Sequence, residues 1–330
     1  MSSSSIAAHP ALRSYWHPVL RATDLGDQPV ARTLLTERIT LFRGANDQPV
    51  AVRDRCPHRE APLSAGRVSD GCLQCPYHGW TFGDDGKCVR IPSNGPSVPA
   101  PPKAHLRPMH CVERYGLVWV CPGEPAAGIP EVPQDTDPSF RRINVEMQQW
   151  QTSALRMVDN FLDISHFPWV HAGTLGGASD EIVPTFELTD LGDFHGYAYE
   201  VDVTNTSEDS RRAVGAAAST LTRSMTSGFA LPFTCRSTIR YETGLDHVIL
   251  LLSTPIDDVT SYFTFVIWRN DDFSVPAEEV IRFDRAVGEE DRRMLERLDG
   301  PFPLERGALC DVRADRTGVE WRRRLSALLG

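Results

Sequence analysis

The sequence predicts an α+β protein, in which a small all-β domain is followed by a larger domain of antiparallel sheet and helices. Short apolar runs separated by turn residues fill the first third of the chain, a spacing typical of antiparallel strands. A second set of strand-like runs lies between residues 181 and 270, with amphipathic patterns that predict helices on either side. We place the boundary in the loose segment 122–138 and assign residues 1–125 and 126–330 to the two domains.

Composition restricts the class of protein. Hydrophobic residues make up 41% of the 330 residues and charged residues 24%, as in ordinary globular proteins. The net charge of −10 disfavours nucleic acid as a partner. No apolar run approaches the roughly 18 residues of a membrane span, and the amino terminus lacks the features of a secretion signal. We therefore expect a cytoplasmic protein without a membrane partner, whose residues 1–10, with four consecutive serines, are disordered.

The first domain combines predicted strands with many cysteines. Strands are expected at Thr33–Leu35, Ile39–Phe42, Val50–Val52, Trp80–Phe82 and Leu117–Cys121. The eight cysteines of the chain show no regular disulfide pattern, so metal ligation is favoured in a reducing compartment. Six prolines between residues 91 and 108 predict an extended connection within this part of the chain.

Two cysteine–histidine pairs lie in this domain. Cys56-Pro-His58 is followed after sixteen residues by Cys75-Pro-Tyr-His78. Zinc also binds two cysteines and two histidines, but zinc motifs more often pair cysteine with cysteine. A Rieske cluster, with two irons and two sulfides, takes two cysteines on one iron and two histidines on the other. Two loops that each supply one cysteine and one histidine therefore favour a Rieske cluster.

A helical pattern over residues 155–171 carries two further histidines. At about 100° per residue, one face holds Arg156, Asp159, Asn160, Asp163 and His166. The pattern alone is also typical of an amphipathic helix with its polar face in water. Pro168 should bend or end the helix, which allows His166 and His171 to turn toward one point. Two histidines and one carboxylate form the triad that holds ferrous iron in oxygenases.

The third ligand is expected from a helix at about residues 277–298. Its apolar stripe is predicted to contain Val280, Phe283, Val287, Met294 and Leu298. Asp291 lies within about 30° of the centre of that stripe, whereas Asp284 and Glu290 lie further from it. Burial of a lone carboxylate is costly unless a cation accepts it, so Asp291 is the candidate ligand. The alternative is a solvated acidic cluster at residues 289–291.

Together these motifs resemble the terminal oxygenase component of Rieske non-haem iron oxygenases. The resemblance rests on Cys56-Pro-His58-Arg59, on Cys75-Pro-Tyr-His78-Gly-Trp80 and on Asn160-x-x-Asp163-x-x-His166-x-x-x-x-His171. With the helix that carries Asp291, it covers nearly the whole chain and points to the vanillate and dicamba O-demethylase branch. It implies a Rieske domain, a catalytic domain of the helix-grip type and a head-to-tail homotrimer.

The resemblance also implies roles for single residues. Cys56 and Cys75 would bind one iron of the cluster, and His58 and His78 the other. His166, His171 and Asp291 would hold the mononuclear Fe(II). Asp163 would bridge to a cluster histidine of the neighbouring subunit, and Asn160 of the same motif joins it as a catalytic candidate. One departure is Glu60, where glycine commonly follows the His-Arg pair, which bears on the turn of the cluster loop.

The function implied is a monooxygenase that uses O2 and electrons from NAD(P)H. No G-x-G-x-x-G follows a predicted strand, so the electrons are expected from a separate reductase, with or without a ferredoxin. The product would be a hydroxylated or an O- or N-demethylated small aromatic or heterocyclic compound. The alternative is an iron-sulfur electron carrier or a zinc-stabilised binding protein without oxygenase activity.

Overall fold

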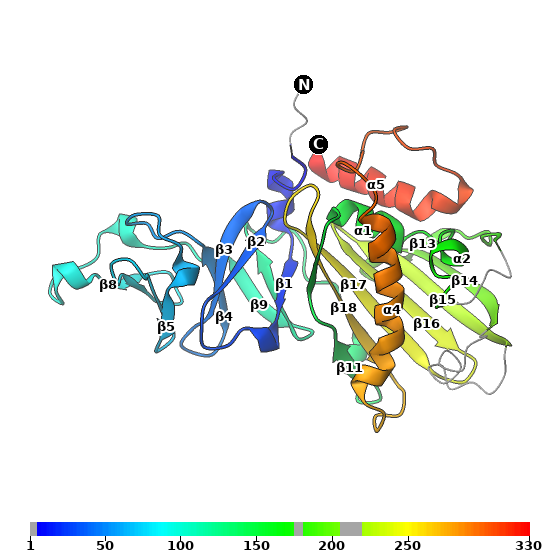
Figure 1. Cartoon of the computed structure of the whole chain (residues 1–330), viewed down its shortest axis with the longest axis horizontal. Coiled ribbons are helices and arrows are strands. Elements are labelled where there is room, and N and C mark those ends of the chain that lie inside the picture. Colours follow the sequence, from blue (N-terminus) through cyan, green and yellow to red (C-terminus); the bar gives the residue numbers. More distant parts are fainter. Residues whose placement is uncertain (1–4, 175–180, 205–219) are drawn as a thin grey trace. The chain divides into compact units, whose positions relative to one another are not determined.

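The computed structural model describes residues 5–174, 181–204 and 220–330. The chain divides into two compact units, one of residues 1–129 with 254–257 and one of residues 130–253 with 258–330 (Figure 1). Residues 254–257, which the sequence places in the second domain, thus group with the first unit. The predicted α+β class is confirmed, since sheets fill the first unit, and one large sheet with helices forms the second.

The first unit contains three small antiparallel sheets. The first consists of β1 (His17–Arg21), β10 (Leu117–Cys121) and β9 (His110–Arg114). The second consists of β2 (Val30–Leu34), β3 (Glu37–Arg43) and β4 (Pro49–Arg53). The third consists of β5 (Arg67–Ser69), β6 (Cys72–Gln74), β7 (Thr81–Phe82) and β8 (Cys88–Arg90). Each strand expected in this part of the sequence overlaps an observed one, because alternating apolar side chains reach the core from both sides of each turn.

One buried carboxylate connects the end of β4 to the loop that follows. Asp54 accepts hydrogen bonds from the Thr40 hydroxyl at 2.8 Å and from the backbone N–H and hydroxyl of Ser64, both at 2.8 Å. Arg38 adds an ion pair at 2.9 Å. Burial alone would raise the pKa of Asp54, but these donors lower it below its ordinary value. The loop that begins at Arg55 is therefore fixed at both of its ends.

The second unit is built on one antiparallel sheet. Its strands, in spatial order, are β11 (Arg141–Asn144), β18 (Ser261–Arg269), β17 (Asp246–Pro255), β16 (Thr234–Tyr241), β15 (Thr220–Ala230), β14 (Phe194–Thr204) and β13 (Leu188–Leu191), and β12 (Gln148–Trp150) also pairs with β18. The strand β18 lies inside the sheet, and all its residues except Tyr262 are buried, so both faces of this strand are covered.

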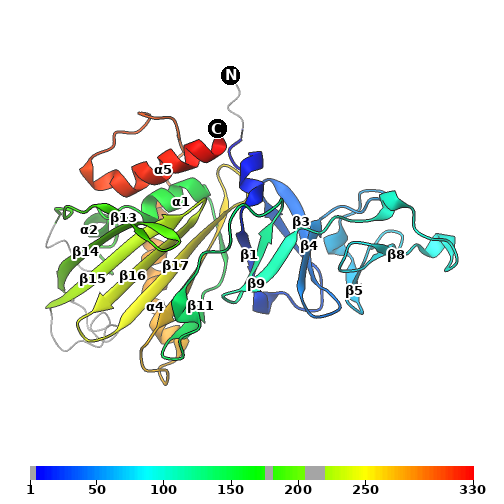
Figure 2. The same cartoon turned by 180° about the vertical axis from the view of Figure 1, so that it is seen from behind.

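Helices cover this sheet. They are α1 (Ala154–Phe161), α2 (Phe167–Val170), α4 (Ala277–Leu295) and α5 (Arg316–Leu329). Figure 1 shows α4 across one face of the sheet, and Figure 2 shows the strands from the opposite side. The helix break that was expected at Pro168, between the two histidines, lies before both of them. The helix α1 ends at Phe161, and Pro168 lies in the first turn of α2, where its missing N–H costs nothing.

The buried face of α4 also differs from the predicted stripe. Val280, Asp291 and Leu295 are buried, whereas Met294 and Leu298 are 42% and 39% exposed. The line of inward residues steps by three or four from 280 through 284, 287 and 291 to 295, as an α-helix requires. The helix ends at Leu295, so Leu298 lies beyond it. The prediction that Asp291 is buried on this helix is confirmed at 6% exposure.

The expectation of disorder over residues 1–10 does not hold for residues 5–10. Ala7 is 2% exposed, and the His9 side chain accepts a hydrogen bond from the backbone N–H of Ala11 at the start of a short 3-10 helix, Pro10–Ser14. A cap and a buried side chain give this segment contacts that its composition did not predict. Across the described residues, no helix is both long and apolar enough to cross a membrane.

We predict that Asp54→Asn lowers the free energy of unfolding of the first unit by about 1–3 kcal/mol, because an amide cannot satisfy several donors that face a carboxylate. The urea concentration at the midpoint of unfolding should fall. It is measured by far-ultraviolet circular dichroism and by the visible absorption of protein that carries the expected iron-sulfur cluster. Asp47→Asn is the matched control, since the Asp47 side chain is 88% exposed. Equal midpoints for both variants would contradict the role given to Asp54.

Candidate metal centres

The two cysteine–histidine loops of the first unit have the same backbone turn. The N–H of Glu60 donates to the carbonyl of Cys56 at 2.9 Å, and the N–H of Gly79 donates to the carbonyl of Cys75 at 3.2 Å. Glu60 has φ +61° and Gly79 has φ +71°. Glycine suits this left-handed conformation, and another residue costs about 1–2 kcal/mol. The glutamate at position 60, where the resemblance leads us to expect glycine, therefore affects the turn of the first loop. The Glu60 side chain forms an ion pair with Arg55.

The four candidate ligands of these loops face one another. The Cys56 and Cys75 side chains are 1% and 2% exposed and lie in contact, and burial raises the pKa of the Cys56 thiol to about 11 while backbone N–H donors oppose the rise. The rings of His58 and His78 meet edge to face with centroids 4.4 Å apart. The Nδ1 atom of His58 is buried without a hydrogen-bond partner among the described residues.

This arrangement fits a two-iron cluster. Two adjacent thiols and two adjacent imidazoles match the cysteine pair and histidine pair of a Rieske centre, and an orphaned buried Nδ1 is explained by a metal bond. Trp80 stacks on His58 with centroids 4.5 Å apart and an interplanar angle of 7°, which fixes the ring. His78 and its neighbour Tyr77 are exposed, so one edge of the site reaches the surface.

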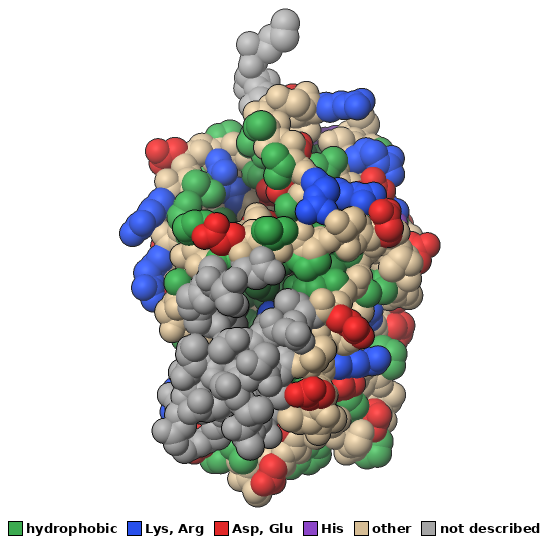
Figure 3. Space-filling model, turned by 90° about the vertical axis from the view of Figure 1, so that its right-hand side faces the viewer, with side chains coloured by type: hydrophobic (Ala, Val, Ile, Leu, Met, Phe, Trp, Pro, Cys, Tyr) green, Lys and Arg blue, Asp and Glu red, His purple; other side chains and the backbone are tan. Residues whose placement is uncertain are grey.

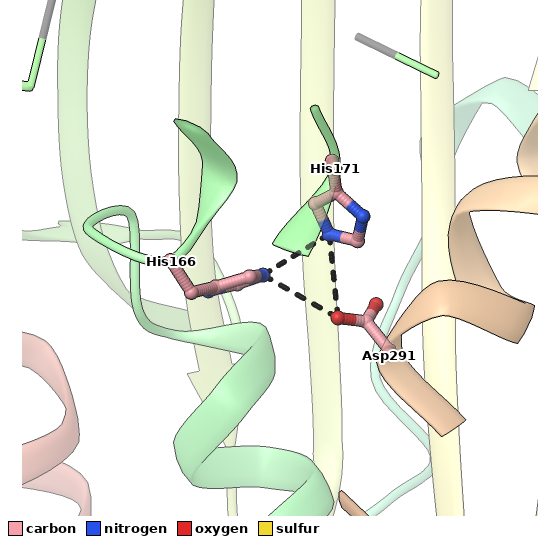
Figure 4. Close-up of side chains that lie close together, drawn as sticks. All are labelled: His166, His171 and Asp291. Atoms are coloured by element: carbon pink, nitrogen blue, oxygen red, sulfur yellow. Dashed lines mark hydrogen bonds and ion pairs between the residues drawn. The ribbon is translucent and has the colours of Figure 1, made fainter. Parts of the chain in front are cut away.

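In the second unit, His166, His171 and Asp291 converge (Figure 4). The two Nε2 atoms are 3.1 Å apart. Oδ1 of Asp291 lies 3.4 Å from Nε2 of His166 and 3.3 Å from Nε2 of His171. Ligand atoms about 2.1 Å from a metal and at right angles to each other are about 3 Å apart. The three side chains therefore fit one face of an octahedral metal ion.

A carboxylate holds each histidine by its other ring nitrogen. Asp163 Oδ2 lies 3.1 Å from Nδ1 of His166, and Glu290 Oε2 lies 3.0 Å from Nδ1 of His171. Because a carboxylate only accepts, each Nδ1 carries a proton, and the Nε2 atom of each ring is the one that is directed toward Asp291 and available to a metal ion. This is the orientation that a metal-binding histidine needs.

The electrostatics of the triad favour a cation at its centre. Burial lowers the pKa of His166, but Asp163 and Asp291 outweigh it and raise that pKa to about 9. Burial raises the pKa of Asp291, but the two histidines lower it well below its ordinary range. A site with such affinity for a proton also binds a metal cation, because both accept the same lone pairs.

Asn160 and Asp163 lie beside the triad and not within it. The Asn160 amide donates to Oδ1 of Asp291 at 3.0 Å and so orients the carboxylate. Asp163 also accepts from the backbone N–H and hydroxyl of Ser165, at 2.8 and 2.6 Å. The other acidic residues considered as metal ligands do not point to the centre of the triad. Asp284 lies 3.2 Å from Nε2 of His247, and Glu290 contacts Nδ1 of His171, on the opposite side of that ring.

A pocket adjoins the triad. The space free of protein atoms is about 880 Å³ when it is counted to the mouth of the pocket with open solvent included. Apolar side chains from the sheet, from α1 and from α4 form most of its wall, among them Phe161, Met225, Leu251 and Phe265. A small organic molecule bound there would lie against the three candidate ligands in a mostly dry environment.

Sequence reasoning missed the role of Glu290. Besides His171, its Oε2 accepts from the Thr174 hydroxyl at 2.7 Å. Gly173 allows this approach, since a Cβ there would lie 2.9 Å from Oε1. The adjacent pair Glu290-Asp291 was a signal, because neighbouring helical residues point about 100° apart and can address two different sides of one histidine.

Comparisons with known families match both units. The Rieske [2Fe-2S] domain matches residues 15–112. The vanillate O-demethylase oxygenase C-terminal domain matches residues 150–330, which include the triad.

Relatives and solved structures agree with these matches. The chain is 32% identical to methylxanthine N1-demethylase NdmA of Pseudomonas putida, over 96% of this chain and 89% of that protein. It is 35% identical to the oxygenase component of dicamba O-demethylase of Stenotrophomonas maltophilia, over 48% of each. The structure of Pseudomonas putida NdmA with caffeine has a TM-score of 0.81 at 29% identity, covering 97% of this chain and 92% of that one.

We predict that Glu290→Gln weakens the affinity of the triad for ferrous iron by about 10–100-fold, the usual cost of losing a carboxylate behind a metal-binding histidine. Anaerobic titration of the metal-depleted protein with ferrous iron measures this affinity. The visible spectrum of the first unit should not change. Glu289→Gln is the control, since Glu289 is 47% exposed. Equal affinities for ferrous iron in Glu290→Gln and Glu289→Gln would contradict the role given to Glu290.

Proposed function

The chain belongs to the Rieske non-haem iron oxygenases, and on this basis we propose that it hydroxylates or demethylates a small aromatic or heterocyclic compound. One observation carries the proposal: two histidine Nε2 atoms and a buried carboxylate converge within 3.4 Å of each other at the wall of an apolar pocket. A Rieske electron carrier or a zinc-stabilised binding protein needs no such second centre.

The proposed ligands follow from the two sites. Cys56 and Cys75 would hold one iron of the cluster, and His58 and His78 the other. His166, His171 and Asp291 would hold the mononuclear Fe(II), with Asp163, Glu290 and Asn160 orienting them. When bound, the cluster stores an electron and the ferrous ion activates O2. The work of the chain is to orient the ligands, to exclude water and to place the reacting carbon of the substrate beside the triad.

Demethylation is supported by the relatives, whose names describe N- and O-demethylases. An O-methyl or N-methyl substrate, O2, NAD(P)H and a proton would give the demethylated product, formaldehyde, water and NAD(P)+. The methyl carbon is oxidised and loses its bond to oxygen or nitrogen after hydroxylation. The electrons would come from a separate reductase. None of the eight cysteines forms a disulfide in the structure, which supports our proposal of a cytoplasmic, reducing location.

We also propose a homotrimer in which a neighbour docks outside the triad. A second cavity of about 930 Å³, counted to its mouth, is lined by Asp163, Asp159 and Arg322. Its rim holds Leu298 and Leu309, which are 39% and 37% exposed. Figure 3 shows an end of the molecule on which hydrophobic side chains gather near the centre. A cluster histidine of a neighbour that entered this cavity would reach Asp163, whose other side already contacts His166.

Formaldehyde release tests the proposed reaction. Purified protein loaded with iron and sulfide, a Rieske-oxygenase reductase and NADH should convert a member of a panel of methoxylated aromatics and N-methylated heterocycles. Formaldehyde should appear in step with substrate-dependent O2 uptake, and ring-hydroxylated products should be sought by mass spectrometry. NADH oxidation without any oxygenated product across the panel would favour an electron carrier.

We predict that Asp291→Ala abolishes turnover and removes the mononuclear iron, because two neutral imidazoles alone bind Fe(II) weakly. Iron per chain should fall while the visible spectrum of the cluster stays intact. Asp284→Ala is the comparison, since Asp284 lies on the same helix but contacts His247, and it should keep its iron. If Asp291→Ala keeps iron and activity while Glu290→Ala loses them, the carboxylate ligand is misassigned.

We predict that electrons cross between subunits at Asp163. Trimers of Cys56→Ser alone and of His166→Ala alone should be inactive. Mixed trimers made by co-expression place an intact cluster beside an intact iron site and should regain partial activity. Adding Asp163→Ala to the Cys56→Ser chain should remove that gain even at a ferrous iron concentration that fills the triad, which iron per chain would verify. Mixed trimers that form but stay inactive would favour transfer within one chain.

A further inference from the structure

The two cysteine–histidine loops of the first unit are closed by the same backbone hydrogen bond. The N–H of Cys56 donates to the carbonyl of Ala61 at 2.9 Å, and the N–H of Cys75 donates to the carbonyl of Trp80 at 2.8 Å. Each loop therefore closes between a candidate cysteine ligand and the residue five positions later. Because that residue is alanine in the first loop and tryptophan in the second, the two loops share a backbone but not a lining.

This difference gives the two candidate histidine ligands unequal surroundings. The Trp80 indole, from the second loop, lies parallel to the His58 ring of the first loop, with centroids 4.5 Å apart and an interplanar angle of 7°. The ring of His78 contacts the neighbouring Tyr77 ring at 3.9 Å between centroids, and both of these side chains are exposed. One face of His58 is therefore covered by an indole, whereas His78 is open to water.

The core of the first unit holds Trp80 in this position. Its side chain packs against a buried group of residues that includes Leu63, Phe82 and the two candidate cysteine ligands. Its carbonyl is fixed by the hydrogen bond that closes the loop, and the next residue, Thr81, begins β7. The stacked pair is therefore part of the packed interior of the unit and not a contact between two exposed rings.

An indole stacked on a metal-bound histidine favours one charge state of the metal. Two ferric ions, two sulfides, two thiolates and two neutral imidazoles carry no net charge, and one added electron leaves one negative charge. Because the indole keeps water away from the histidine, it disfavours the charged, reduced state. The negative π face of the indole also attracts a more positive ring, and an imidazole is more positive on a ferric than on a ferrous ion. Both effects therefore favour the oxidised state.

We propose that Trp80 lowers the reduction potential of the Rieske cluster by covering one face of His58. This inference rests on the proposed ligand roles of His58 and His78. Trp80 is a positioning residue that acts through His58: the electron enters from the reductase and leaves toward the triad, and Trp80 is neither oxidised nor reduced. A lower potential makes the reduced cluster a stronger electron donor, so Trp80 increases the driving force for electron transfer to the mononuclear site.

Anaerobic redox titration of the full chain, loaded with cluster and iron, tests the proposal without turnover. Visible absorption and the electron paramagnetic resonance signal of the reduced cluster report the potential. In Trp80→Ala, the equilibrium constant for one-electron reduction should rise about tenfold, which corresponds to about 59 mV. Trp80→Leu restores apolar bulk without a π face and should show a smaller rise. Trp80→Phe keeps an aromatic face and should stay within about threefold of the unmodified chain.

Trp16→Leu is the matched control, because Trp16 is half-buried in the same unit and meets His110, which is not a candidate ligand, edge to face with centroids 6.4 Å apart. Its potential should equal that of the unmodified chain. Iron and sulfide per chain and far-ultraviolet circular dichroism establish that each variant is loaded and folded. If Trp80→Ala alone loses the cluster, a potential in Trp80→Leu above that of Trp80→Phe supports the proposal.

The proposal is overturned if the potentials of Trp80→Ala and Trp80→Leu equal or lie below that of the unmodified chain. It is also overturned if both variants lose the cluster, because Trp80 is then a structural residue. These outcomes are separate from the tests of the proposed function. An unmodified chain without Rieske absorption after loading would remove the cluster itself, whereas raised potentials without formaldehyde release would keep the role of Trp80 and remove the demethylase activity.

Discussion

Two imidazole Nε2 atoms and a carboxylate oxygen meet within 3.4 Å of one another, and no Lys or Arg side chain among the described residues forms an ion pair with Asp291. Three acceptors at this distance repel unless a cation lies between them. They are held there because Asp163 and Glu290 occupy the opposite nitrogens of the two rings. The end of α1 at Phe161, the turn that follows it and the position of α4 all serve this convergence.

The long helix α4 joins the metal centre to the substrate pocket. Its inward stripe carries Asp291 at the triad and Asp284 in the wall of the same pocket, so one rigid element supplies both a candidate metal ligand and part of the pocket wall. The sheet supplies the remaining wall, where apolar side chains exclude water. The triad and the pocket therefore depend on the same packing of α4 against the strands. In this packing Val280, Ile281 and Leu295 are buried against the sheet.

Residue type and spacing were sufficient to predict the candidate ligands. Cysteine–histidine pairs and a carboxylate on an apolar stripe have few other uses, so Cys56, His58, Cys75, His78, His166, His171 and Asp291 could be named from sequence. The supporting residues could not. Glu290 reaches His171 through the angle at which α4 meets the loop after α2, and the strand side of the pocket wall is assembled by strand pairing. Such contacts between distant segments leave no periodic signal, and Pro168 misled because a proline starts a helix as readily as it ends one.

The central claim is that this chain holds an iron in addition to its cluster. Iron, zinc and acid-labile sulfide per chain, measured on protein reconstituted anaerobically and freed of loosely bound metal, test it most directly. One two-iron cluster and one facial-triad iron give about three irons and two sulfides. Two irons and two sulfides in protein that retains oxygenase activity, or zinc in place of iron without sulfide, would contradict the account.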